Sequence, residues 1–246
     1  MMTPLIDLHN HILPHDHDGA SSLDESLRMA DIAVRSGISH IVCTPHFEGS
    51  ARSFRTLPDI RQAFTDLKQA IAETGLPLTL SCAAEILCTE QTLSLAADVR
   101  LPTLDGKRRL LTEFYFDESP EQINTLLSGL SAQQYVPVIA HPERYHALQR
   151  DPRLAEYWFR QGYLLQVNKG SILGAFGDRV QRTAHRLLAD GAAHVIATDA
   201  HHASARTPDL SALYHWLTGH CPRNYAEILL FRNPRRILEG RPVVPV

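Results

Sequence analysis

Short apolar runs alternate along the chain with longer stretches in which apolar residues recur every three or four positions. The short runs have the length and composition of buried strands, and the longer stretches have the periodicity of helices packed on one face. Seven strands are predicted in this way, at Leu5–Leu8, Ser39–Thr44, Leu78–Ala84, Leu110–Tyr115, Val136–Ala140, Leu164–Val167 and His194–Thr198. Strands that alternate with helices in this order are typical of a parallel sheet with helices packed around it.

Capping residues mark the ends of several predicted helices. Ser22 can cap a helix that Glu25 closes as a capping box and that Gly37 terminates. Ser119 precedes Pro120, which suits the first position of another helix. Three further glycines follow apolar-periodic stretches at places where a helix should end: Gly75, Gly162 and Gly191. A last helix is expected at Asn233–Arg236. Because no flexible linker or internal repeat interrupts this order, we expect residues 1–246 to form one domain.

Polar or ionisable residues stand where each predicted strand ends. In chain order they are His9 and His11, His46, Glu85, Glu113, His141, Asn168, and Asp199 with His201. Parallel barrels and open sheets place their active sites at the carboxyl ends of the strands, so these side chains should converge on one face. The sequence therefore predicts an α/β fold, a distorted seven-stranded (β/α)7 relative of the TIM barrel. A doubly wound sheet is the alternative, although its single crevice would gather fewer of these residues.

The residue types at these strand ends are those that bind metals. His9 and His11 are two positions apart in a strand, so both rings point to the same side, and Asp18 follows across a loop that turns at Gly19. The candidate ligands are nine in all: His9, His11, Asp18, His46, Glu85, Glu113, His141, Asp199 and His201. Nitrogen and oxygen ligands without thiolate suit manganese, iron, zinc or cobalt, with magnesium as a further candidate. Because nine ligands are too many for one ion, two or three divalent metals are expected.

Composition excludes several other classes of function. The formal net charge is −3 and no long run of like charge is present, so a nucleic-acid partner is not expected. No stretch approaches the roughly 18 apolar residues of a spanning helix, and the first residues do not resemble a signal peptide. We therefore expect a cytoplasmic protein without membrane insertion. Its four cysteines are expected to be reduced, and none is followed six positions later by the arginine of a thiol-phosphatase loop.

Seven motifs along the chain carry a resemblance to a known family. They are His9-Asn10-His11, Asp18-Gly19, Thr44-Pro45-His46, Ala84-Glu85-Ile86, Glu113-Phe114, Ala140-His141-Pro142-Glu143-Arg144-Tyr145 and Thr198-Asp199-Ala200-His201. From Ile6 to the Asn233-Pro234 segment the chain resembles the polymerase and histidinol phosphatase (PHP) superfamily. Within it, the chain is most similar to the bacterial capsular-polysaccharide type of metal-dependent protein-tyrosine phosphatase.

This resemblance implies a fold, a substrate and a mechanism. It implies a distorted seven-stranded barrel in which the nine residues hold three metals, usually manganese, and a hydroxide bridging two ions attacks phosphorus in line. The implied substrate is a phosphotyrosyl protein, such as the tail of a membrane-associated tyrosine kinase that controls capsule or exopolysaccharide synthesis. Arg144, three residues after His141, and Arg206, just after His201, are expected to hold the outer phosphate oxygens.

The chain departs from the pattern of this group next to Asp18. The group usually has two consecutive aspartates before the glycine, whereas here His17 precedes Asp18, and Asp16 replaces a residue that is usually apolar. His15, His17 and His202 lie close to ligand positions and are candidates for a supporting role around the metals.

Three other functions remain open from the sequence. Histidinol phosphate or another small phosphomonoester would require the same metal chemistry and a different rim. A metal-dependent amidohydrolase also uses strand-end histidines, but no strand-end lysine of the kind that becomes a carbamylated bridge is present, Lys169 being the nearest. A module that kept the fold and lost its metals is the third alternative, and the complete ligand set argues against it.

Overall fold

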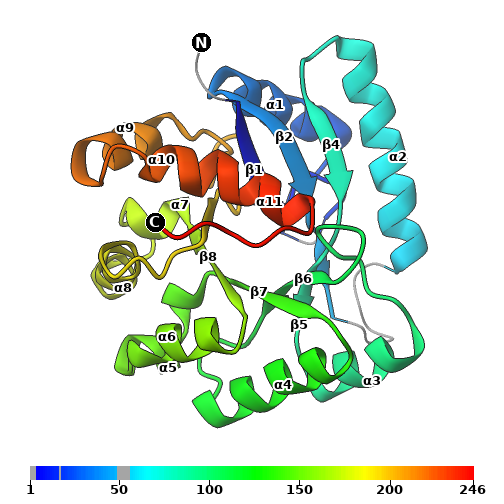
Figure 1. Cartoon of the computed structure of the whole chain (residues 1–246). Coiled ribbons are helices and arrows are strands. Elements are labelled where there is room, and N and C mark those ends of the chain that lie inside the picture. The colour runs from blue at the N-terminus through cyan, green and yellow to red at the C-terminus, as the bar shows by residue number, and fades with distance from the viewer. Residues whose placement is uncertain (1–3, 17, 49–55) are drawn as a thin grey trace.

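Parallel strands form two adjoining sheets in the computed structural model, which describes residues 4–16, 18–48 and 56–246 (Figure 1). The first sheet has the order β1-β2-β4, formed by Leu5–Asn10, Ile38–Cys43 and Thr79–Cys82. The second has the order β3-β5-β6-β7-β8-β9, formed by His46–Phe47, Glu85–Leu87, Arg109–Glu113, Val136–Ala140, Leu164–Asn168 and Val195–Ala197. Each pair of neighbouring strands within these sheets is parallel, as predicted.

All seven predicted strands are present, and two of them are followed by short strands that were not predicted. After β2 the chain passes through Pro45 and re-enters the second sheet as β3, and after β4 it re-enters as β5. Pro45 has no backbone N–H and cannot donate to a ladder, although its carbonyl accepts from the backbone N–H of Glu85 at 3.0 Å. His46 and Glu85 are therefore the first residues of β3 and β5, and they pair in register.

The two sheets also meet at the carboxyl ends of β1 and β9. Asn10 forms an isolated parallel bridge with Ala200. The backbone N–H of Asp199 donates to His9 at 2.9 Å, and that of His11 donates to Ala200 at 2.8 Å. These hydrogen bonds join the first strand, β1, to the last strand, β9, next to the candidate ligands.

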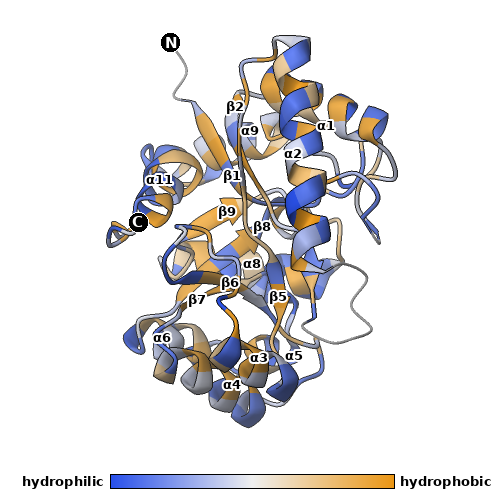
Figure 2. Ribbon diagram, turned by 90° about the vertical axis from the view of Figure 1, so that its right-hand side faces the viewer, coloured by the Kyte–Doolittle hydropathy of each residue, from blue (hydrophilic) through white to orange (hydrophobic). Residues whose placement is uncertain are grey.

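Helices surround the strands and turn their polar faces outward (Figures 1 and 2). Their bounds are α1 Leu23–Arg35, α2 Leu57–Thr74, α3 Glu90–Asp98, α4 Pro120–Ala132, α5 His146–Arg150, α6 Arg153–Arg160, α7 Lys169–Ile172, α8 Asp178–Ala189, α9 Ser211–His220, α10 Tyr225–Glu227 and α11 Asn233–Leu238. A 3-10 turn, η1, covers Pro142–Arg144, and a π-helical turn, η2, covers Ile228–Arg232. Within the described ranges, no helix has both the length and the apolar content that crossing a bilayer requires.

The predicted helix caps are found, with one change of partner. Ser22 caps α1 and accepts from the backbone N–H of Glu25 at 3.2 Å. The carboxylate of Glu25 does not return to Ser22, however, and instead accepts from the backbone and the hydroxyl of Ser21 at 2.9 and 2.6 Å. Ser119 caps α4 with Pro120 in its first turn, as expected. The carboxylate of Glu25 thus bonds the residue before the cap, Ser21, and not the cap itself. It satisfies the backbone N–H of Ser21 next to the start of α1.

Two hydrophobic clusters hold the strands in place. The larger one lies between the strands and the helices that cover them. The smaller one takes alternate residues from β1 and β7, single residues from four other strands and two residues from the connecting segments, and Ile237 of α11 joins it. These residues are Ile6, Leu8, Val138 and Ala140; Val42, Leu111, Leu164 and Val195; and Ala83 and Leu104. Alternate strand residues point to the same face of a sheet, so this second cluster covers one face of the strands. The site residues at the strand ends therefore rest on a packed apolar layer.

His194, the residue before β9, makes the free energy of unfolding depend on pH. Its Nδ1 accepts from the backbone N–H of Leu165 at 3.0 Å, and its ring lies 4.6 Å from that of Phe159. Burial lowers its pKa to about 4. Because the unfolded chain binds the proton near pH 6.5, His194 contributes full stability above that pH and loses it as the pH falls through 4.

We expect His194→Asn to remove this pH dependence while keeping an acceptor for Leu165. Two to three pKa units correspond to about 3 kcal/mol of unfolding free energy between pH 7 and pH 4. Urea unfolding of the wild type and the variant at both pH values measures it. Equal pH dependence in the two proteins would contradict the assignment.

Candidate metal centre

Histidine and carboxylate side chains from the strand ends converge in one cluster, and all nine predicted ligand residues belong to it. His9 and His11 come from β1, His46 and Glu85 begin β3 and β5, Glu113 ends β6, His141 follows β7, Asp199 and His201 follow β9, and Asp18 lies in the loop before α1. The Nε2 atoms of His9 and His11 lie 3.1 Å apart, which confirms that the two rings share a side. Glycine is needed at position 19, because a Cβ there would lie 2.6 Å from the carbonyl oxygen of His11.

Glu85 lies at the centre of the cluster and is fully buried. Its Oε2 is 3.1 Å from Nε2 of His9, 3.2 Å from Nε2 of His11 and 3.1 Å from Nδ1 of His46. Its Oε1 is 2.9 Å from Nε2 of His141. One carboxylate thus faces four imidazoles with its two oxygens.

The other carboxylates link the remaining histidines. Asp18 contacts Nε2 of His46 at 3.3 Å and Nε2 of His201 at 3.4 Å. Oδ1 of Asp199 lies 3.5 Å from both His11 and His201. Three overlapping groups each bring their donor atoms within 4.8 Å of one another: His11, Asp18, His46 and His201; His9, His11 and Asp199; and His46, Glu85 and Glu113.

The histidines at the centre are oriented as metal ligands are. Nδ1 of His9 lies 2.8 Å from Oε1 of Gln166, so the ring can donate to Gln166 from Nδ1 while its Nε2 faces the cluster. Nδ1 of His11 lies 3.6 Å from a carboxylate oxygen of Asp16. Neighbouring donors about 3 Å apart match the edges of a coordination shell with bonds of about 2.1 Å. The residues present therefore fit divalent cations held by nitrogen and oxygen.

Burial and nearby carboxylates shift the pKa values of two histidines of the cluster in opposite directions. Burial lowers the pKa of His46, but the carboxylates of Glu85, Asp18 and Glu113 outweigh it and raise that pKa to about 10. Burial lowers the pKa of His201 to about 4. Without a cation, protons on histidine therefore balance part of the carboxylate charge, and metal binding has to release them.

The backbone is strained where the strands end. His141, Asp199 and Arg206 have φ of +35°, +50° and +49°, a region that residues with a side chain seldom adopt. Such strain persists only where the surrounding structure imposes it, and it gathers at functional sites. Here it turns the chain sharply after β7 and β9, so that both ligands and Arg206 face the cluster.

Both predicted arginines lie beside the cluster. Arg206 pairs with Oδ2 of Asp199 at 2.6 Å, and Arg144 approaches the same oxygen at 3.9 Å. Oδ1 of Asp199 faces the histidines, whereas Oδ2 faces the two arginines. Asp199 therefore lies between the candidate metal ligands and the guanidinium groups. An anion that bridged the two sides would meet guanidinium groups as well as metals.

Two polar residues that support the cluster, Gln166 and Asp7, were not predicted as part of the site. Gln166 orients His9, and its amide donates to Asn168, which in turn donates to Asp199. Asp7 is fully buried and accepts from the backbone and the hydroxyl of Thr198. A polar residue inside an otherwise apolar strand, as at Gln166, is the signal that could have identified them.

The candidate supporting residues near Asp18 divide into different roles. Asp16, the acidic departure from the group pattern, is buried beside His11 and contributes the carboxylate described above. His15 is exposed and lines a separate cavity beside α2. His202 pairs with Glu25 at 3.5 Å, outside the cluster. His17 lies outside the described residues.

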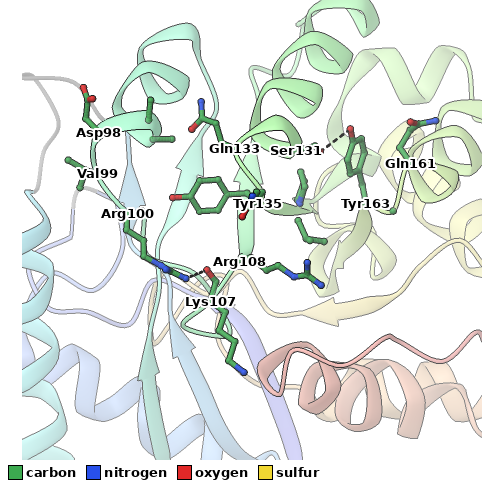
Figure 3. A pocket seen from close by; sticks show the side chains of 16 residues that line it. Asp98, Val99, Arg100, Lys107, Arg108, Ser131, Gln133, Tyr135, Gln161 and Tyr163 are labelled. Carbon is green, nitrogen blue, oxygen red and sulfur yellow. Dashed lines mark hydrogen bonds between the residues drawn. The ribbon is translucent and has the colours of Figure 1, made fainter.

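Two other features lie outside the cluster. The four cysteines are free, and burial raises the pKa of Cys88 to about 12, which disfavours a thiolate nucleophile. A cavity of about 750 Å³ lies at the opposite end of the strands, beside Val136 at the start of β7 and Tyr163 before β8 (Figure 3). None of the nine ligand residues lines it.

Comparison with known proteins agrees with this arrangement. The sequence pattern of the CpsB/CapC family of capsular polysaccharide synthesis matches residues 5–239. The chain belongs to the CpsB/CapC family. It is 33% identical over 203 residues to the tyrosine-protein phosphatase YwqE of Bacillus subtilis, covering 82% of this chain and 79% of YwqE. It is 30% identical over 240 residues to the tyrosine-protein phosphatase CpsB of Streptococcus pneumoniae, covering 95% and 98%.

Solved structures give the same result for this CpsB/CapC chain. A chain from the crystal structures of YwqE and CpsB, described as metal-dependent tyrosine phosphatases, superposes with a TM-score of 0.88 and 29% identity. The match covers 98% of this chain and 97% of that chain. A β-aspartyl dipeptidase superposes with a TM-score of 0.58 at 12% identity, which shows a shared fold alone.

Proposed function

We propose that this CpsB/CapC protein is a metal-dependent protein-tyrosine phosphatase with two or three divalent ions, manganese first among them. The observation that carries the proposal is the convergence of nine nitrogen and oxygen ligands with two arginines that meet at Asp199. The relatives named tyrosine-protein phosphatases support the reaction class. The nine ligand residues named from the sequence are proposed to hold the ions. Ions bound there supply Lewis acidity, which activates water and neutralises phosphoryl charge.

The residues of the chain itself hold and orient the substrate. Arg144 and Arg206 donate to the outer oxygens of the phosphoryl group, and Asp199 keeps both guanidinium groups at the edge of the cluster. The Nε of Arg206 is buried and has no hydrogen-bond partner in the described part of the chain, so it remains free for such an oxygen. Gln166 holds His9 in the tautomer that a cation requires.

The rim of the site suits an aromatic phosphoester. Tyr115 and Phe116 follow the ligand Glu113 closely and are 56% and 39% exposed. The ring of Phe116 lies 5.9 Å from that of His141, edge to face. Exposed rings beside a phosphate site favour a substrate with a ring of its own. The proposed substrate is accordingly a phosphotyrosyl protein, with the tail of a membrane-associated kinase of capsule synthesis as the first candidate.

We also propose the barrel fold and the cytoplasmic location that the sequence predicts. The two sheets are proposed to form one distorted seven-stranded barrel in a single domain over residues 1–246, with β2–β3 and β4–β5 each counted as one bent strand. A cytoplasmic location agrees with four cysteines that are all free. An amidohydrolase is disfavoured because Nζ of Lys169 donates to the carbonyls of Thr207 and Asp209, away from the ligands.

Chelation and metal return test the proposal. We expect the chelated protein to melt at a lower temperature and to lose turnover of a phosphotyrosyl peptide, because bound cations stabilise the folded state and supply the reaction. Adding manganese back should restore the melting temperature and the turnover of the peptide. Histidinol phosphate is assayed in parallel, and we expect its turnover to be slow. A reversed preference would make the small phosphomonoester the substrate, and no hydrolysis of either would overturn the phosphatase assignment.

A further inference from the structure

One phenyl ring contacts both arginines beside the cluster. Phe176 lies in the loop between α7 and α8, and its centroid is 4.6 Å from Cζ of Arg144 and 5.7 Å from Cζ of Arg206. The guanidinium of Arg144 also lies 4.3 Å from the ring of Phe116. A guanidinium over an aromatic face is held by cation–π attraction. Phe176 is therefore a shared contact for two side chains that come from different loops.

The cation–π contact with Phe176 leaves the N–H groups of both arginines available to the site. A guanidinium that an aromatic ring holds through cation–π attraction keeps its N–H groups available for directed bonds to oxyanions. One terminal nitrogen of each arginine faces Oδ2 of Asp199, at 2.6 Å for Arg206 and 3.9 Å for Arg144. The Nε of Arg206 is buried without a hydrogen-bond partner in the described residues, so it is a further donor available to an oxyanion.

The position of the ring depends on a glycine. A Cβ at Gly170 would lie 2.8 Å from Cε2 and 3.2 Å from Cζ of Phe176, so only glycine leaves room for the ring. The loop is held against the same residue, because the backbone N–H of Ala175 donates to the carbonyl of Gly170 at 2.8 Å. Gly170 is in α7 and has no positive φ, so an alanine there would displace the ring without straining the backbone.

We propose that Phe176 is a positioning residue that holds Arg144 and Arg206 edge-on toward a phosphoryl oxygen. The inference rests on the proposed function for the identity of the ligand as a phosphomonoester. It assigns to the α7–α8 loop the alignment of both phosphate-binding side chains. Gly170 contributes to this positioning, because the absence of a Cβ there leaves room for the ring of Phe176.

Calorimetric titration with inorganic phosphate tests this without turnover. In the manganese-loaded protein, Phe176→Leu should weaken phosphate binding about tenfold, since a cation–π contact is lost from each arginine. Phe176→Tyr keeps the ring and should bind within about twofold of the wild type. Gly170→Ala should weaken binding in the same direction as Phe176→Leu although the ring is still present. Phe159→Leu removes an exposed ring on α6 and is the matched control, expected to bind as the wild type does.

A double-variant cycle separates positioning from a general loss of structure. If Phe176 acts through the arginines, Phe176→Leu combined with Arg144→Lys should weaken phosphate binding by less than the product of the two separate losses. Losses that multiply in full, or a Phe176→Leu protein that binds phosphate like the wild type, would overturn the inference. Peptide turnover is measured alongside: a wild type that binds phosphate but hydrolyses no phosphotyrosyl peptide would refute the proposed function, while the titrations would still decide the role of Phe176.

Discussion

Replacing Glu85 by glutamine is expected to abolish turnover while leaving the fold intact. Both oxygens of Glu85 face imidazole nitrogens, at 3.1 Å for His9 and His46 and 2.9 Å for His141. A neutral amide has nearly the same shape but cannot bridge cations as an anion and turns an N–H₂ group toward some of these nitrogens. We expect metal occupancy to fall and kcat/KM on a phosphotyrosyl peptide to drop by about a thousandfold or more.

Metal content and activity, measured together, test this expectation. Glu121→Gln is the matched control, because Glu121 is an exposed carboxylate in the first turn of α4 and lies outside the cluster. Circular dichroism shows whether each variant is folded. A folded Glu85→Gln protein with full metal content and wild-type turnover would remove Glu85 from the proposed ligands.

The strand pattern could be predicted from the sequence because buried strands are continuous apolar runs. Val136–Ala140 was predicted with the bounds that the structure has. The short strands β3 and β5 were missed, since two or three residues carry no periodicity and Pro45 ends the preceding run. Their absence from the prediction did not misplace His46 and Glu85, because both strands continue toward the same face of the sheet.

The site could be predicted as a set of residues and not as a geometry. Parallel strands bring their carboxyl ends together, so the convergence of His9, His141 and Asp199 follows from topology. That Glu85 is central, and that Asp199 turns one oxygen to the histidines and the other to the arginines, depends on side-chain conformations that spacing does not encode. Phe176 has no sequence signal at all, since its role comes from a loop that folds back onto Gly170.

Replacing Asp199 by alanine is expected to have an effect as large as that of Glu85→Gln, for two separate reasons. The change removes the oxygen that faces His9 and His11 and also the oxygen that pairs with Arg206. Turnover of the peptide should therefore fall by about a thousandfold or more, with loss of metal and weaker phosphate binding together.

Asp199→Asn separates the two roles of this residue. Asparagine tolerates the positive φ of +50° at this position and keeps one oxygen, but it carries no charge to attract the guanidinium groups or a cation. We expect it to retain more metal than Asp199→Ala does and still to lose most of its turnover. Asp98→Ala, which removes an exposed carboxylate beside the cavity at the opposite end of the strands, should leave metal content and rate unchanged. Near-normal turnover in a folded Asp199→Ala protein would exclude Asp199 as the residue that joins the metals to the arginines.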